Sequence, residues 1–259
     1  MLRIEPIPAF DDNYLWLVHD GSHAIIVDPG DPVPVVAALQ RLNLQLHAIL
    51  LTHHHNDHIG GVSELCAQFD VEVFAPADER IPFATRRVGG GDSVDLAAPS
   101  LRLRVLDLPG HTRSHIGYYG SGLLLCGDTL FSAGCGRLFE GTPAQMLASL
   151  DTLAALPPET SVCCAHEYTW SNCAYAVTVE PANTRLRARV DEVRTLRAQG
   201  LPSVPSTIAL ERATNPFLRA DEPDVIAWGE RHGIAAGARV ERFAALRRGK
   251  DQFRAPATW

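Results

Sequence analysis

The heptapeptide Thr-His-His-His-Asn-Asp-His at residues 52–58 decides which fold and which chemistry this chain can support. It follows the apolar run at 48–51, a strand candidate, and precedes two glycines. In an extended segment, residues two apart face the same side, so His53 and His55 can reach one metal ion while His54 points away. The alternative is a polar loop whose histidines only cap backbone groups. So dense a set of imidazoles, which are common metal ligands, favours the metal site.

Asp57 and His58 close the heptapeptide. If the chain turns into a helix after His55, these two side chains are delivered to a second point a short distance further on. The heptapeptide therefore predicts ligands for more than one position of a metal site.

Three further segments place a potential ligand directly after an apolar strand candidate. They read LPGHT, CGDT and CAHE, and their ligands are His111, Asp128 and His166. Ligands at the ends of strands converge on one edge of a sheet, where open α/β folds place their sites. One such segment alone is typical of an ordinary turn. Together with the heptapeptide, the three segments indicate a single constellation.

The number of ligands indicates how many ions they hold. Five histidines and two aspartates are more than one catalytic zinc ion uses, since such an ion has three protein ligands plus water. Two divalent ions per chain are therefore implied. Imidazole and carboxylate ligands without thiolate suit zinc, and also iron or manganese. We expect His53, His55 and His111 at the first ion, Asp57, His58 and His166 at the second, and Asp128 as the bridge between them.

The first two thirds of the chain alternate short apolar runs with turns and helix starts. Asp31 followed by proline opens a helix to about Leu42, with the acid as N-cap. Thr142 followed by proline opens another, and Gln145 completes a capping box. Strands in alternation with helices predict an α/β layered fold. The strand candidates are Asn13 to Val18, Ala24 to Val27, Ala48 to Leu51, Val71 to Phe74, Leu101 to Leu108, Leu123 to Cys126 and Ser161 to Cys164.

After about Trp170 the pattern becomes helical and the charge changes sign. Residues 1–180 hold 9 Lys and Arg against 21 Asp and Glu, whereas residues 181–259 hold 14 against 9. We therefore predict two domains, an α/β domain at 1–170 and a smaller all-helical domain at 171–259 with no strand in it. Its helices are expected at Asn183 to Gln199, Glu222 to His232 and Ala238 to Arg248.

Composition narrows the class of protein. With 259 residues and 46% hydrophobic content, the chain can bury a sizeable core. A net charge of -7 argues against nucleic acid as the main partner. The sequence offers no apolar targeting segment at its start and no run of bilayer length, so we expect a soluble cytoplasmic protein without a membrane partner. The six cysteines match neither a zinc ribbon nor a disulfide framework, which predicts buried reduced thiols.

The motifs resemble those of the metallo-β-lactamase superfamily and, within it, of glyoxalase II, the hydroxyacylglutathione hydrolases. The metal motif alone indicates the superfamily, whereas GCGRLFEG, HEYT and RRGKDQF point to the specific family and extend the resemblance over essentially the whole chain. The resemblance implies an αββα sandwich followed by a smaller helical substrate-binding domain. The motifs are THHHNDHIGG at 52–61, PGHT at 109–112, GDTLF at 127–131, GCGRLFEG at 134–141, HEYT at 166–169, NPF at 215–217 and RRGKDQF at 247–253.

The resemblance also implies an activity. It is the hydrolysis of S-(2-hydroxyacyl)glutathione, chiefly S-D-lactoylglutathione, to glutathione and a 2-hydroxy acid, the second step of methylglyoxal detoxification. Two metals roughly 3.5 to 4 Å apart can share a water and lower its pKa towards about 7, which gives a bridging hydroxide nucleophile. We expect Asp57 to orient this hydroxide and Asp128 to hold both metals. Asp28 resembles the superfamily's buried aspartate that hydrogen-bonds a ligand histidine, and the alternative is a plain turn-forming aspartate.

Substrate recognition calls for cationic side chains, because glutathione carries two carboxylates. By resemblance, Arg137, Phe139, Tyr168, Arg247 and Lys250 line the glutathione pocket. Relatives with Lys and Tyr where Arg137 and Phe139 stand have a hydroxyl that Phe139 lacks, whereas Arg137 keeps the charge. Lys250 is the only lysine beside 22 arginines, which favours a specific role over a solvated charge.

Two alternatives stay open at this point. The chain is another enzyme of the superfamily, such as a lactonase, a phosphodiesterase or the iron dioxygenase of glutathione persulfide, or it is a metal-binding scaffold without activity. The second ligand set argues against a single-metal dioxygenase, and the presence of all seven ligands argues against a scaffold. We expect a monomer, since the helical domain should cover its own active site.

Overall fold

A computed structural model describes residues 2–255, which form two compact units. Unit 1 comprises residues 2–108, 114–127 and 163–166, and unit 2 comprises residues 109–113, 128–162 and 167–255. Each unit is thus assembled from segments that lie far apart in the sequence. Within residues 2–255, no helix is both long enough and apolar enough to cross a bilayer.

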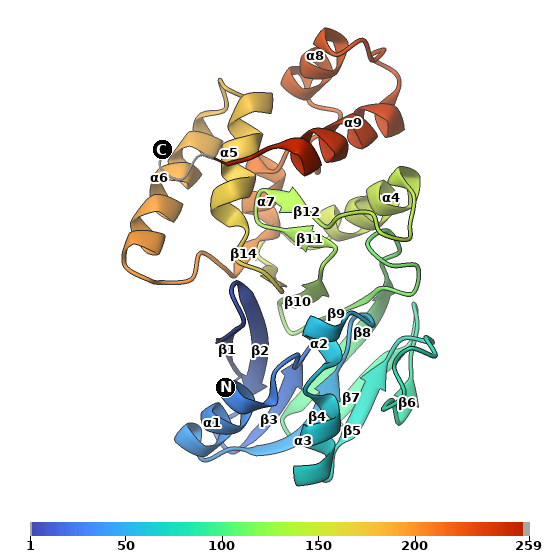
Figure 1. The fold of residues 1–259 in the computed structure, drawn as a ribbon, viewed down its shortest axis with the longest axis vertical. Helices are drawn as coiled ribbons and strands as arrows, with labels where there is room; N and C mark the ends of the chain where they lie inside the picture. Colours follow the sequence, from blue (N-terminus) through green and yellow to red (C-terminus); the bar gives the residue numbers. More distant parts are fainter. Residues whose placement is uncertain (1, 256–259) are drawn as a thin grey trace. The chain divides into compact units, whose positions relative to one another are not determined.

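The first sheet of unit 1 has an antiparallel and a parallel half (Figure 1). The first three strands pair antiparallel, and the third to the sixth pair in parallel. Its first strand contains Pro6 and Pro8, which an edge strand tolerates because one of its sides forms no ladder. In sheet order the strands are β1 (Arg3–Ala9), β2 (Asn13–His19), β3 (His23–Val27), β4 (Gln45–Leu50), β5 (Glu72–Ala75) and β6 (Arg86–Arg87).

Helices α1 (Pro32–Leu42) and α3 (Val62–Gln68) pack on this sheet through one apolar core (Figure 1). Helix α1 begins as predicted, because the carboxylate of Asp31 accepts a hydrogen bond from the backbone N–H of Val33 at 2.9 Å. Burial of the helix faces against strands supplies most of their stability, since isolated helices of this length are marginal in water. The shared core includes Val35, Leu39, Leu65, Ile26 and Ile49.

The second sheet of unit 1 is antiparallel from β7 to β10. The buried hydroxyl of Tyr118 donates to the backbone oxygen of Leu51, 2.9 Å away, and so ties this sheet to the end of β4. Burial raises the pKa of Tyr118 well above its usual value, so the hydroxyl stays protonated and can donate this hydrogen bond. The strands are β7 (Ser93–Ala97), β8 (Ser100–Asp107), β9 (Ile116–Gly120), β10 (Leu123–Gly127) and the end of β13 (Ser161–Cys164).

Unit 2 is mainly helical. Its first helix has the predicted capping box, in which the backbone N–H groups of Thr142 and Gln145 each donate to the side chain of the other residue, at 2.9 and 3.2 Å. The helices are α4 (Pro143–Ala154), α5 (Thr169–Val179), α6 (Thr184–Ala198), α7 (Ile208–Thr214), α8 (Pro223–Arg231) and α9 (Arg239–Gln252). Strand β11 (Leu130–Phe131) pairs with β12 (Gly134–Cys135), and β14 (Ser206–Thr207) pairs with the first half of β13.

The predicted α/β fold with a following helical region is confirmed. Every predicted strand and helix is present; β13 has the predicted bounds, α1 and α4 begin as predicted, and most other ends are shifted. The expectation that no strand follows residue 170 was wrong, since β14 lies at Ser206–Thr207. A strand of two residues is too short to show an alternating pattern in the sequence. Helix α5 was missed because it is apolar on most of its surface and so lacks a clear helical stripe. The division into domains at residue 170 stays a prediction. The outer ends of the two predicted domains, residues 1 and 256–259, lie outside the described residues.

Candidate active site

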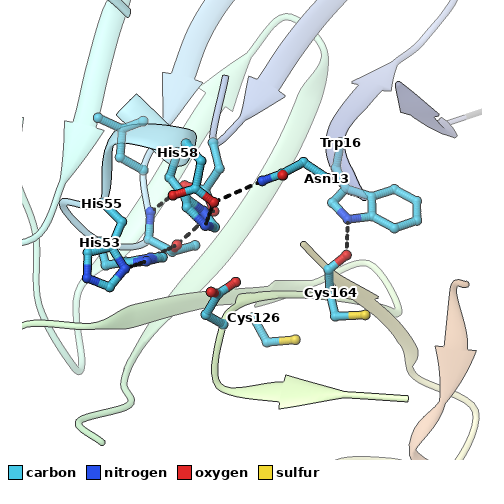
Figure 2. A network of polar contacts seen from close by, with 12 residues as sticks. Asn13, Trp16, His53, His55, His58, Cys126 and Cys164 are labelled. Carbon is cyan, nitrogen blue, oxygen red and sulfur yellow. Dashed lines mark hydrogen bonds and ion pairs between the residues drawn. The ribbon is translucent and has the colours of Figure 1, made fainter. Parts of the chain in front are cut away.

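The residues of the heptapeptide leave β4 in extended conformation before a short helix begins. Nε2 of His53 lies 3.0 Å from Nδ1 of His55, so these two imidazoles face one another (Figure 2). The ring of His54 turns elsewhere, with Nδ1 3.7 Å from the carboxylate of Asp78. This is the arrangement that alternation along an extended segment predicts.

Helix α2 (Asn56–Ile59) brings Asp57 and His58 together with His166, which follows β13. Oδ2 of Asp57 lies 3.4 Å from Nε2 of His58 and 3.5 Å from Nε2 of His166. One donor atom from each of the three residues lies within 4.8 Å of the other two. In a tetrahedral site with bonds of about 2.1 Å, ligand atoms stand roughly 3.4 Å apart, so this donor set fits one zinc-sized ion.

Asp28 lies beneath this group, buried at the end of β3. One of its oxygens lies 3.0 Å from Nδ1 of His58 and accepts a hydrogen bond from the hydroxyl of Thr52, 2.7 Å away. The other oxygen accepts the backbone N–H of Thr52 at 2.8 Å. A carboxylate this close favours the tautomer of His58 that carries its proton on Nδ1, which leaves Nε2 for a ligand bond.

His111 and Asp128 lie together in unit 2, with Nε2 of His111 3.3 Å from Oδ2 of Asp128. Nδ1 of His111 lies 2.9 Å from the backbone oxygen of Arg137, which orients the ring with Nε2 towards the carboxylate. Gly136 allows this close approach, because a Cβ there would lie only 1.9 Å from the backbone oxygen of Asp128. Gly136, the second glycine of the GCGRLFEG motif, is therefore a steric requirement of the site.

A cavity of about 390 Å³ opens beside these two residues within unit 2. It contains every residue that the sequence analysis assigned to glutathione binding. Its walls combine imidazole, carboxylate, cationic and aromatic groups. The lining residues are His111, Asp128, Phe131, Cys135, Arg137, Phe139, Tyr168, Ser171, Asn172, Arg247, Lys250 and Phe253.

Lys250 is half-buried in the cavity wall, and its ammonium donates to the hydroxyl of Ser171 at 2.7 Å. Burial, together with the positive charges of Arg247 and Arg137, lowers the pKa of Lys250 to about 8. The amine is therefore charged at neutral pH but close to its titration range. Such a group binds an anion strongly below its pKa and weakly above it.

Arg247 is largely buried in the cavity wall and holds neighbouring residues of the wall in place. It is 5% exposed, donates to the backbone oxygen of Cys135 and to the carboxylate of Asp251, and lies over the ring of Phe217. Arg137 differs, because its side chain is 63% exposed and lies 3.6 Å from Asp251. Of the two guanidinium groups, Arg137 is the one available to a bound carboxylate.

Two aromatic side chains complete the cavity. Phe139 is 62% exposed and meets the ring of His111 edge to face at a centroid separation of 5.2 Å. Tyr168 packs against Phe131 in the same way, also at 5.2 Å. An apolar edge thus stands directly beside a candidate metal ligand.

Two polar residues at the start of β2 contact candidate ligands, although no motif indicates them. Asp12 contacts His166, and Asn13 contacts Asp57. The only local signal was the polar run Asp11-Asp12-Asn13 before an apolar strand, which is also the composition of an ordinary turn. Cavity residues such as Ser171 and Asn172 carried no distinguishing pattern at all.

Comparisons with known proteins give matches along the whole chain. Residues 10–166 match the metallo-β-lactamase superfamily, and residues 167–253 match the family described as hydroxyacylglutathione hydrolase C-terminus. A hydroxyacylglutathione hydrolase of Methylobacillus flagellatus is 53% identical to this chain and aligns with 98% of it and 100% of the relative.

Solved structures share the fold. The crystal structure of ETHE1 from Myxococcus xanthus has a TM-score of 0.67 at 24% identity, covering 98% of this chain and 93% of that one. The structure of TTHA1623 in a di-iron-bound form has a TM-score of 0.60 at 28% identity, covering 83% of this chain and 100% of that one. The first likeness is evidence of fold alone.

Proposed function

We propose, on the premise that this chain belongs to the hydroxyacylglutathione hydrolase family of the metallo-β-lactamase superfamily, that it hydrolyses S-(2-hydroxyacyl)glutathione thioesters to glutathione and a 2-hydroxy acid. One observation carries the proposal. The cavity of unit 2 holds His111 and Asp128 beside cationic and aromatic side chains suited to glutathione. The substrate expected first is S-D-lactoylglutathione, which makes the reaction the second step of methylglyoxal detoxification, in the cytoplasm of a monomeric enzyme.

The proposed ligand set consists of the seven residues named from the sequence. His53, His55 and His111 would hold one divalent ion, Asp57, His58 and His166 would hold a second, and Asp128 would serve both. Support comes from the donor separations of 3.3 to 3.5 Å within the two units. Zinc is the first choice for imidazole and carboxylate donors. The similar structure TTHA1623 in a di-iron-bound form keeps iron as the other candidate.

Two bound divalent ions supply a water of lowered pKa and a Lewis acid for the thioester carbonyl. Asp57 orients the attacking water, since its side chain is 41% exposed while Asn13 donates to its Oδ2 at 3.0 Å. His58 and His111 present Nε2 because their Nδ1 atoms lie beside a carboxylate and a backbone oxygen. The leaving sulfur needs no strong acid, because thiols are far more acidic than alcohols.

The cavity walls supply the binding energy. Lys250 and Arg137 pair with the carboxylates of glutathione in charge-assisted hydrogen bonds. Phe139 and Tyr168 cover the apolar part of the substrate, and Phe139 does so without a hydroxyl. Because Arg247 is already engaged with Asp251, its contribution is to hold the wall in place.

The test is steady-state hydrolysis of S-D-lactoylglutathione, with the metal content of the same sample measured in parallel. We expect fast turnover with about two ions per chain. S-D-lactoyl-N-acetylcysteamine, which has the thioester but not the carboxylates, is the matched substrate and should show a much higher KM. Two ions without thioesterase activity, or equal KM values for the two substrates, would refute the proposal.

A further inference from the structure

The start of β2 lies against the segment that carries His166 (Figure 2). The backbone N–H of Tyr14 donates to the oxygen of Ala165 at 2.7 Å, and Asn13 forms an antiparallel bridge with His166. The indole N–H of Trp16 donates to the oxygen of Cys164 at 2.9 Å. These contacts fix the turn at residues 10–12 and the first residue of β2 beside the candidate ligands.

Asp12, held in this position, contacts the imidazole of His166. Its Oδ1 lies 2.8 Å from Nδ1 of His166, whose Nε2 lies 3.5 Å from Oδ2 of Asp57. Since a carboxylate only accepts, the contact places the proton of His166 on Nδ1 and leaves the lone pair of Nε2 directed at Asp57. An oxygen of Asp28 lies 3.0 Å from Nδ1 of His58, so each of the two imidazoles of this group has a buried or half-buried carboxylate beside its Nδ1.

Asn13 uses the same position to contact the carboxylate. Its side-chain amide donates from Nδ2 to Oδ2 of Asp57 at 3.0 Å, and Asn13 is only 6% exposed (Figure 2). The oxygen that receives this hydrogen bond is the one that faces both imidazoles. An amide is neutral, so Asn13 orients the carboxylate of Asp57 without competing with it for a metal cation.

We propose that Asp12 and Asn13 are positioning residues of the second metal ion, Asp12 acting through the tautomer of His166 and Asn13 through the orientation of Asp57. This inference rests on the proposed role of His166 and Asp57 as ligands. A carboxylate that accepts from a ligand histidine raises the basicity of that imidazole, and a hydrogen bond donated to a ligand carboxylate fixes its orientation. Loss of such a partner typically costs 10- to 100-fold in metal affinity. The hairpin turn therefore belongs to the metal site although it supplies no ligand to it.

The experiment measures the tautomer of His166 in the metal-free, full-length protein by long-range proton–nitrogen NMR. We expect the proton of His166 on Nδ1 in the wild type, and a shift of the population towards Nε2 in Asp12→Ala. Asp11→Ala is the matched control, because Asp11 is an exposed carboxylate in the same turn and has the same charge. An unchanged tautomer in Asp12→Ala, or the same change in Asp11→Ala, overturns the assignment of Asp12.

Metal affinity supplies the second measurement. In competition of Zn²⁺ with a chelator, we expect Asp12→Ala and Asn13→Ala to bind one of the two ions roughly 10- to 100-fold less tightly than the wild type, and Asp11→Ala to bind both within about twofold of it. If Asp12→Ala fails to fold, Asp12→Asn takes its place, since the amide oxygen can still accept from Nδ1 and should retain part of the affinity. Equal affinity in all variants overturns the proposal. A chain that hydrolyses no glutathione thioester would refute the proposed function but would leave these apo-protein and metal-binding results standing.

Discussion

Lys250 should give the enzyme a KM that rises on the alkaline side of neutrality. Burial lowers the pKa of its ammonium to about 8, so it is charged below that pH and neutral above it. With this pKa, the charged fraction falls from about nine-tenths at pH 7 to about one-tenth at pH 9. If only the charged form pairs with a glutathione carboxylate, KM rises roughly tenfold over this range while kcat changes little, because uniform binding is lost.

The matched control is Lys250→Arg, whose guanidinium stays charged throughout the range. Its absolute KM can differ from that of the wild type, but the slope of KM with pH reports titration at position 250 alone, because the substrate's own groups titrate equally in both assays. Initial rates on S-D-lactoylglutathione from pH 6.5 to about 9.5 supply both curves. A wild-type KM that is flat, or a rise of the same size in Lys250→Arg, would refute the reasoning.

Three further changes test other parts of the structure. Asp128→Ala should abolish turnover and loosen both ions, measured by assay and metal analysis together, and full activity with two bound ions would exclude the bridging role. Asn215→Ala should lower the free energy of unfolding by about 2 to 4 kcal/mol in urea denaturation, because it removes donors to three buried acceptors. The exposed amide Gln199→Ala is its control and should change stability by less than about 0.5 kcal/mol. Chelation of the metals should lower Tm, since ions that bind only the folded chain stabilise it by mass action, and an unchanged Tm would contradict a site with ligands from several segments.

Four candidate ligands, His53, His111, Asp128 and His166, were predictable because each comes shortly after the end of an apolar strand. Local rules then determine where the side chain points, as the paired imidazoles of His53 and His55 show. Asp12 was beyond such rules, since its contact with His166 spans 154 positions in the chain. Sequence patterns of period two or 3.6 describe which face of an element a residue occupies. They do not describe which distant loop comes to rest against it.

The same limit applies to the fold. Helix α1 and helix α4 were predicted to the residue at their starts, because the caps act within three positions of the chain. Strand β1 was missed because its prolines at positions 6 and 8 indicate against a strand unless it is known to lie at an edge. Whether a strand lies at an edge depends on the complete sheet, so no local sequence pattern can indicate it.

The motifs NPF and RRGKDQF, both markers of the family resemblance, have different physical roles. Asn215 is fully buried and donates to the backbone oxygens of Phe131 and Gly134, at 3.1 and 2.9 Å. Glu211, one turn earlier, accepts from the backbone N–H of Ala133, which has a left-handed φ of 54°. These helix side chains thus fix the tight pair β11–β12.

Phe131 and Cys135, at the two ends of that pair, line the cavity. Asn215 therefore determines the shape of the wall without touching what the cavity holds. In RRGKDQF, by contrast, Lys250 and Phe253 face the cavity, and Arg247 joins the wall to Cys135. A substitution in NPF should accordingly act through stability and cavity shape, whereas one at Lys250 should act chiefly through binding.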